Sequence, residues 1–295
     1  MTDVESAFVD AFQTHRRYLG SVAYRLMGSV TDAEDVLQEA WLRWQSVDRA
    51  GVQDPRAFLT TVVTRLCYDQ LGSARARREA YYGEWLPEPV VAAEDSPAEL
   101  AELGESVSLA MLAVMEQLTP AERAAFVLHD VFAVGFDEIG ATLERTPEAA
   151  RQLASRARRR VREGSRRRTE VDVTEHRQAV TAFAAAAANG DIQALLAVLD
   201  PDVIWHSDGG GVVRAGVRSI AGADKVSRLV AGLIRRADVE FPGGVFEFAL
   251  VNDEPGLVFR TASGEVAGVL AFAVAEGRIA EAYVVVNPEK LTRVA

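Results

Sequence analysis

Residues 136–168 constrain the fold most, because they pair a short apolar-periodic segment with a strongly basic one across a turn. Thr146-Pro147-Glu148 has the residue types that begin a helix: a hydroxyl N-cap, a proline at the first position and an acid in the first turn. Two helices joined in this way are typical of a helix-turn-helix that places its second helix in a DNA major groove. An arginine-rich face exposed only to solvent is the alternative. Apolar residues at helical spacing could pack the pair together, namely Phe136, Ile139, Leu143, Ala150, Leu153 and Ala157.

The charge of the chain is unevenly distributed. Ten arginines against two glutamates between Arg145 and Arg168 give this stretch a balance of about +8. The whole chain carries a net charge of −11, so the remainder carries about −19. The net negative charge argues against a protein that binds nucleic acid non-specifically over its whole surface, whereas one basic helix suits local, sequence-specific DNA binding.

Length and cysteine content limit the function classes. A chain of 295 residues is expected to form two or three domains. Cys67 is the single cysteine, which excludes an intrachain disulfide and any metal site built on cysteine pairs. No metal-ligand spacing occurs elsewhere, and we expect neither a metal nor a cofactor. The sequence shows no signal peptide and no apolar run long enough to span a bilayer, so we expect a cytoplasmic protein without a membrane partner.

The first half of the chain reads as helices in two groups. Residues 5–72 are expected to form three helices, the second beginning at Thr31 and the third at Asp54-Pro55. Residues 79–104 contain three prolines and many acids, as a linker does. Its aromatic part, Tyr81 to Pro87, is apolar enough to dock on a neighbouring domain, with a local cap as the alternative. Residues 105–132 are expected to form two helices that meet at Leu118-Thr119-Pro120.

The pattern changes to α+β after Arg168. An alanine-rich helix is expected over 174–199, broken at Asn189-Gly190-Asp191, and a further helix over about 219–236. Helices followed by strands with short turns predict an α+β domain with a curved antiparallel sheet. Alternating apolar residues predict strands at Val203–His206, Val245–Val251, Gly256–Ala262, Val266–Val274 and Arg278–Val286.

Three segments, in their order, resemble a bacterial RNA polymerase sigma factor of the extracytoplasmic-function class. They are TDAEDVLQEAWLRW, RAFLTTVVTRLCYDQLGSARAR and the block from LTPAERAAF to ARRRV. The remainder resembles a SnoaL-like cone, and WLPEP, DGGG and NPEKL point to the subgroup with this C-terminal extension. The resemblance implies sigma region 2 at 1–78, a linker at 79–104, region 4 at 105–168 and a SnoaL-like regulatory domain at 169–295.

The resemblance also implies three sets of contact residues. Core polymerase would bind an acidic face with a tryptophan, comprising Asp32, Glu34, Asp35, Gln38, Glu39 and Trp41, beside which Trp44 supplies more apolar area. The -10 element would contact Arg65, Asp69, Gln70, Ser73 and Arg75. The -35 element would be read by Arg151, Gln152, Ser155, Arg156 and Arg159. Thr64 stands where family members often carry asparagine, and Arg158, Arg160, Arg162 and Arg166 suit phosphate contacts.

The C-terminal domain is expected to regulate the sigma regions in cis rather than to catalyse a reaction. A general base at His206 or Asp208 beside Trp205 is conceivable, but no catalytic constellation can be assembled around it. The competing interpretation is a one-component DNA-binding regulator with a small-molecule pocket in this domain. Regulation would act through the linker docked on two C-terminal motifs, with the residues Trp85, Leu86, Pro87, Asp208, Gly209, Gly210, Gly211, Asn287 and Pro288.

Overall fold

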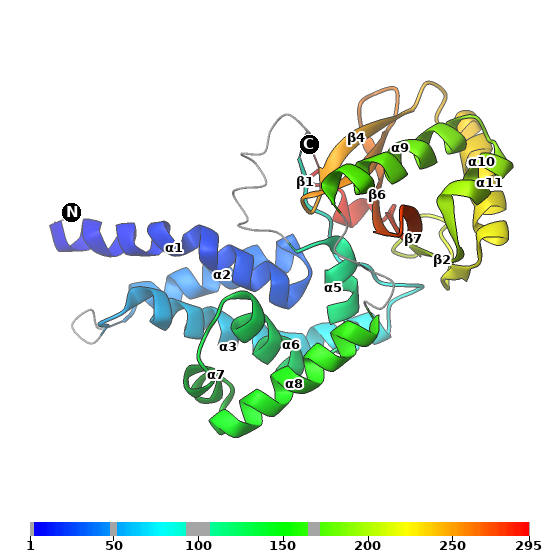
Figure 1. The fold of residues 1–295 in the computed structure, drawn as a ribbon. Coiled ribbons are helices and arrows are strands. Elements are labelled where there is room, and N and C mark those ends of the chain that lie inside the picture. The colour runs from blue at the N-terminus through cyan, green and yellow to red at the C-terminus, as the bar shows by residue number, and fades with distance from the viewer. Residues whose placement is uncertain (1–2, 48–51, 93–106, 165–171, 295) are drawn as a thin grey trace. The chain divides into compact units, whose positions relative to one another are not determined.

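The computed structural model describes residues 3–47, 52–92, 107–164 and 172–294, which form two compact units (Figure 1). The helical unit contains the described residues up to Glu79 together with 114–163. The sheet unit contains 80–92, 107–113, Gly164 and 172–294. The segment predicted as region 2 and most of that predicted as region 4 therefore share one unit, whereas residues 107–113 and the described part of the linker belong with the C-terminal strands. The functional boundaries at residues 78, 104 and 168 stay predictions.

The helical unit begins with three amphipathic helices, α1 (Asp3–Met27), α2 (Val30–Gln45) and α3 (Pro55–Glu79). Gly28, at φ 69°, ends α1 in a left-handed conformation that glycine adopts without strain. Ser29 then caps α2 by accepting a hydrogen bond from the Asp32 amide at 3.1 Å. The predicted helix start, with Thr31 as its N-cap, was wrong because Ser29, two residues earlier, offers the same hydroxyl. The apolar faces form a common core that includes Leu19, Val22, Leu26, Val36, Trp44, Leu59 and Val63.

Four helical segments follow the linker: α5 (Leu109–Met115), α6 (Pro120–Phe126), a π-helical turn η3 (Val127–Val131) and α7 (Phe136–Leu143). The predicted meeting of two helices at Leu118–Pro120 is confirmed, although α5 is shorter than expected. Thr119 and Glu122 form a capping box, in which each side chain bonds the backbone amide of the other.

The helix-turn-helix consists of α7 and α8 (Pro147–Gly164), as predicted. Glu144 closes α7 in the left-handed conformation, and the Thr146 hydroxyl accepts the Ala149 amide at 3.2 Å to begin α8. A Cβ at Gly140 would lie 2.8 Å from the Arg145 carbonyl, so only glycine permits this tight turn. The predicted apolar set is buried between the two helices except for Phe136, which is half-buried.

The sheet unit combines three helices with a seven-stranded sheet. The helices are α9 (Val173–Ala188), α10 (Ile192–Val198) and α11 (Ala223–Glu240). The strand order is β1-β4-β5-β6-β7-β2-β3. The strands are β1 (Val91–Ala92), β2 (Leu199–Asp208), β3 (Ile220–Ala221), β4 (Val245–Val251), β5 (Glu254–Arg260), β6 (Val266–Ala275) and β7 (Arg278–Val285).

The sheet is mixed, which corrects the predicted antiparallel sheet. Strands β4 to β7 alternate in direction because short turns join them. Strand β2 enters after α10 and pairs with β7 in parallel, with Trp205 opposite Ala282. Strand β1 comes from the linker and pairs with the end of β4, Val91 opposite Val251. Strand β1 was not predicted, because so short a segment carries no periodicity. The residues of β3 fall in the helix predicted over about 219–236, which instead begins at Ala223.

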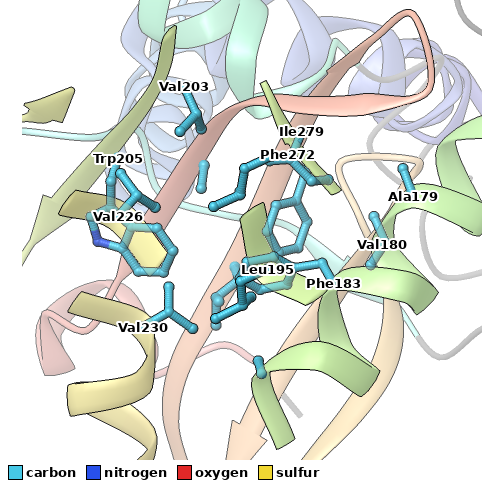
Figure 2. Packing of buried hydrophobic residues seen from close by; sticks show 14 of the residues in the cluster. Ala179, Val180, Phe183, Leu195, Val203, Trp205, Val226, Val230, Phe272 and Ile279 are labelled. Atoms are coloured by element: carbon cyan, nitrogen blue, oxygen red, sulfur yellow. The ribbon is translucent and has the colours of Figure 1, made fainter. Parts of the chain in front are cut away.

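The two faces of the sheet bury separate apolar clusters. The inner face lies under α9, α10 and α11, where Phe183, Trp205 and Phe272 fill the interior of the cone (Figure 2). The outer face packs Val258, Val269 and Tyr283 of the strands against Leu86, Leu109 and Leu291. Leu86 belongs to the linker, and Leu291 follows the 3₁₀ turn η4 (Pro288–Lys290). The outer face is therefore covered by the linker, by α5 and by the C-terminal turn.

His176 on α9 is buried beside the inner cluster and gives the sheet unit a pH-dependent stability. Burial lowers its pKa from the usual 6.5, and a hydrogen bond with the backbone of Pro255 only partly opposes this effect. As the pH falls below 6.5, the unfolded chain takes up a proton that the folded chain resists, so stability is lost. We predict that the difference in unfolding free energy between wild type and His176→Gln narrows from pH 7.5 to pH 5.5 in urea titrations. A difference that is constant with pH would contradict this assignment.

Candidate polymerase and promoter interfaces

The predicted polymerase-binding residues lie along one side of α2. Asp35 and Gln38 are exposed, whereas Asp32, Glu34, Glu39 and Trp41 are partly buried. Glu39 also pairs with Arg43 at 2.7 Å, one turn further along the helix. A shallow surface hollow runs along this side, lined by Asp35, Gln38, Glu39, Leu42, Arg43 and Ser46. The helix thus presents acids beside an apolar centre.

The apolar centre is Leu42 together with Trp41, not the tryptophan pair suggested by the sequence. Trp44 is 1% exposed and packs against Phe58 at 5.8 Å between ring centroids, so it belongs to the core. Trp41 packs edge-on against Phe12 at 5.0 Å and keeps part of its surface in solvent. Leu42 is 64% exposed. Sequence reasoning missed it, although an apolar residue among the polar positions of an amphipathic helix is a readable signal.

The predicted -10 residues lie on α3. Arg65, Asp69 and Ser73 are exposed and Gln70 is half-buried, whereas the side chain of Arg75 lies outside the described residues. Arg65 donates to the carbonyl oxygens of Ala141 at 3.0 Å and Thr142 at 3.3 Å, in the last turn of α7. These two helices come from the segments predicted as regions 2 and 4.

Thr64 is fully buried within the helical unit. Its hydroxyl has no hydrogen-bond partner among the described residues. In this arrangement the side chain at that position is not available to DNA.

A buried ionic network also joins these two regions. Glu116 pairs with Arg78 at the end of α3 and with Arg123 on α6. Arg78 also donates to the carbonyl of Met27, and Arg123 donates to that of Arg25 at 3.1 Å. Arg123 is only 2% exposed, so its charge depends on Glu116 for compensation. Helices α1 to α3 and α6 to α8 are consequently packed together in one unit.

The predicted reading surface of α8 is exposed. Arg151, Gln152, Ser155, Arg156 and Arg159 all lie on the side away from the buried residues Ala150, Leu153, Ala154 and Ala157. Arg151 lies over the Phe136 ring at 5.1 Å, and that ring stacks on His129 at 3.9 Å. The stacked rings of His129 and Phe136 thus contact Arg151, the first of the exposed arginines along α8.

Two acids from the preceding helical segments bind arginines of α8. Asp130 accepts from Arg158 at 2.5 Å. Glu122 binds both Arg156 and Arg160. Burial raises the pKa of Glu122, but hydrogen bonds from Thr119 and the two arginines outweigh it, so the pKa lies below its usual value and the carboxylate is charged at neutral pH. Sequence reasoning missed this role, although the spacing of Thr119 and Glu122 predicts the capping box.

The linker and two C-terminal motifs meet at the carboxylate of Asp208, at the end of β2. Asp208 is completely buried. One carboxylate oxygen accepts from the Tyr81 hydroxyl at 2.6 Å and the Gly210 amide at 3.0 Å. The other accepts from the Leu86 amide at 2.9 Å and the Lys290 ammonium at 2.7 Å. Four donors from three segments therefore share one charge.

The surrounding groups close this cluster. Lys290 also donates to the Leu86 carbonyl and lies over the Trp85 ring at 4.0 Å. Asn287 caps η4 through the Glu289 amide and donates to the Tyr81 hydroxyl at 2.8 Å. A Cβ at Gly210 would lie 2.6 Å from Asn287, and one at Gly209 would lie 2.2 Å from the Val213 carbonyl. Burial and the nearby Asp208 raise the pKa of Tyr81, which keeps its hydroxyl a donor.

The remaining motif residues lie around the cluster. Pro87 is buried, Gly211 is exposed next to Tyr82, and Pro288 is exposed at the start of η4. The Nδ1 atom of His206 lies 2.6 Å from the Oε1 atom of Glu84, and the His206 ring stacks on that of Tyr283 with 4.9 Å between ring centroids. Trp205 belongs to the inner cluster, because neighbouring residues of a strand point to opposite faces. His206 therefore does not lie beside Trp205, contrary to the arrangement considered from the sequence.

The chain matches two family models, Sigma-70 region 2 over residues 11–77 and Sigma-70 region 4 over residues 108–161. It is 43% identical over 295 residues to the ECF RNA polymerase sigma factor SigJ of Mycobacterium tuberculosis, covering 96% of this chain and 93% of that protein. The chain belongs to the extracytoplasmic-function sigma factors. A probable SigI of the same organism is 35% identical over 283 residues, with 95% and 93% covered.

The fold agrees with this assignment. The crystal structure of the M. tuberculosis sigma factor SigJ matches with a TM-score of 0.77 and 39% identity, covering 96% of this chain and 98% of that one. The comparisons favour a sigma factor over a one-component regulator, because the relatives match both sigma regions and the C-terminal part. Within the described residues, no helix has the length and apolar character needed to cross a membrane, and no cluster of three metal-ligating side chains occurs.

The Asp208 cluster makes a direct stability prediction. Lys290→Met leaves the buried carboxylate without its cation, and we expect a loss of about 3 kcal/mol in urea unfolding of the sheet unit. Lys225→Met, at an exposed lysine on α11, serves as the control and should change stability by less than about 0.5 kcal/mol. Adding Asp208→Asn to Lys290→Met should recover part of the loss, since it removes the uncompensated charge. Equal stability of wild type and Lys290→Met would refute the argument.

Proposed function

We propose that this sigma factor binds core polymerase through α2, reads promoter DNA through α3 and α8, and is regulated in cis by the sheet unit, which anchors the linker. The proposed regulatory role is supported by the contacts of Asp208. Its buried carboxylate accepts hydrogen bonds from both the linker and the C-terminal motifs. A small molecule bound in the cone stays a prediction, and side chains fill the cone's interior around Phe183 and Phe272 (Figure 2).

The face of α2 has the character of a polar rim around an apolar contact. Leu42 and the exposed part of Trp41 offer apolar surface, and burying this surface on binding is energetically favourable. Asp35 and Glu39 provide negative charge beside them, which suits a basic groove on the polymerase. A repressor that acts without polymerase has no need of such a face.

Promoter recognition requires the helical unit to open. The two elements are named for positions about 25 base pairs apart, roughly 85 Å of B-form DNA at about 3.4 Å per base pair. Here Arg65 of α3 is bonded to α7, and Arg78 and Arg123 share Glu116. Helices packed in this way do not reach both elements, so we infer that the described arrangement is a closed state.

The docked linker favours the closed state. Residues 80–92 form the first part of the chain between α3 and the second sigma region, and they lie on the outer face of the sheet unit, where β1 pairs with β4. Asn252 extends that pairing, because its amide donates to the Val90 carbonyl at 2.8 Å and its side chain accepts the Val90 amide at 3.1 Å. Release of these residues adds about 40 Å of extended chain at roughly 3.3 Å per residue. The sheet unit thus controls how far the two regions can separate.

The polymerase interface is tested by adding the purified full-length chain to sigma-free core polymerase and mapping transcript starts on a supercoiled genomic pool. We predict specific starts with wild type. Asp35→Lys should weaken core binding about tenfold, roughly 1.4 kcal/mol, because it reverses a charge beside the apolar contact. Asp238→Lys, at an exposed acid on α11, is the matched control. Equal weakening by both variants, or no starts with wild type, contradicts the proposed interface.

The regulatory role is tested by Trp85→Ala, which removes the ring beneath Lys290 but leaves the ion pair with Asp208. We expect faster proteolysis within residues 80–92 and more transcript per bound polymerase than with wild type. Tyr82→Ala, at a neighbouring ring that is 68% exposed, should leave both measurements near the wild-type values. If Trp85→Ala changes neither measurement, the linker does not control activity.

A further inference from the structure

We propose that Glu122 is a positioning residue for promoter discrimination, which orients Arg156 of the recognition helix toward the bases and also holds Arg160, a residue suited to a phosphate contact. This inference rests on the proposed role of α8 in reading the promoter. It adds a residue on α6 that does not itself face DNA and whose effect passes through the two arginines. The evidence is the anchoring of its carboxylate, the way it holds the arginines, and the contrast with Asp130.

Hydrogen bonds within α6 and its cap hold the Glu122 carboxylate in place independently of the arginines. It is 3% exposed and lies in the first turn of α6. One of its oxygens accepts from the Thr119 amide at 3.1 Å and from the Thr119 hydroxyl at 2.9 Å. The Glu122 amide in turn donates to the Thr119 hydroxyl at 3.3 Å. A buried acid held by a helix cap has little freedom to move, so its position is set by α6.

This fixed charge holds each arginine by part of its guanidinium. Arg156 donates its Nε to one carboxylate oxygen at 3.3 Å, and Arg160 donates Nη1 to the other. The side chains remain 49% and 44% exposed. With Nε engaged, the two Nη groups of Arg156 remain, and these form the fork that can bond guanine O6 and N7 together. The contact therefore orients the arginine without using its reading edge.

Holding the arginines changes specificity more than affinity. An arginine without such a partner on a helix surface samples many rotamers and can bind DNA phosphates regardless of the base sequence. Glu122 removes part of that freedom in advance, which lowers the entropic cost of a correctly placed base contact. Its negative charge also offsets the attraction of the two arginines for phosphate on any sequence. Both effects increase the ratio of promoter binding to non-specific binding.

Asp130 provides the contrast within the same molecule. It is exposed, follows α6 in the turn η3, and binds Arg158 at 2.5 Å. Its carboxylate has no helix cap to fix it among the contacts of the described residues. Arg158 is half-buried and suits a phosphate contact rather than a base contact. We therefore expect Asp130 to modulate affinity for all DNA alike.

The test uses holoenzyme made from core polymerase and the full-length chain, on a promoter from which wild type initiates and on the same duplex with its -35 element scrambled. Glu122→Gln keeps an oxygen that can accept from Thr119 but removes the charge that holds the arginines. We expect the ratio of the two affinities to fall about tenfold, while binding to the scrambled duplex stays equal or becomes stronger. Asp130→Asn should leave the ratio unchanged.

A double-mutant cycle separates positioning from a structural role. In an Arg156→Ala background, Glu122→Gln should have little further effect on the ratio, because the residue through which it acts is gone. Arg156→Lys keeps the charge but lacks the two Nη groups of the fork. We expect it to lower the ratio of promoter affinity to scrambled-duplex affinity in a folded protein, which keeps the proposal testable even if Glu122→Gln proves unstable. The proposal is overturned if Glu122→Gln weakens binding to both duplexes equally. It is also overturned if Glu122→Gln lowers the affinity ratio as much in the Arg156→Ala background as in wild type. Absence of initiation by wild type would instead refute the proposed function.

Discussion

The buried carboxylate of Asp208 is the interaction on which the outer face of the sheet unit depends. A charge without solvent contact is tolerated only when donors surround it, and here they come from residues 81 to 86, from the glycine turn and from Lys290. If any of these segments leaves, the charge loses a donor. The linker is therefore tied to the same equilibrium as the C-terminal turn, and the proposed regulation in cis rests on this coupling.

The helical unit uses the same chemistry at two other places. Glu116 compensates Arg78 and the buried Arg123, which joins the two sigma regions. Glu122 joins the cap of α6 to the arginines of α8. In each case a buried or partly buried carboxylate contacts arginines from another segment, since an unpaired charge in such a place is costly. In our proposal, the Glu116 contacts maintain the closed arrangement and the Glu122 contacts orient arginines of α8.

Much of the fold could be predicted from local patterns. The helix-turn-helix followed from Thr146-Pro147 and from the apolar spacing around Ile139 and Leu153, and the structure confirms it. The strands after residue 200 followed from period-two alternation. The parallel pairing of β2 with β7 could not be predicted in this way, because it joins segments far apart in the chain and leaves no local signal. The same applies to β1, which has two residues and exists only through its partner β4.

For the candidate sites, sequence by itself determined residue chemistry and exposure patterns: the acidic side of α2, the arginine row of α8 and the motifs that surround Asp208. Tertiary structure decided which of these groups are engaged. It buried Trp44 and exposed Leu42, bonded Arg65 to α7, placed Trp205 on the face opposite His206, and brought Glu122 to Arg156. The physical reason is that helical and strand periods are local properties, whereas the burial and pairing of charges depend on which distant segments exclude water from them.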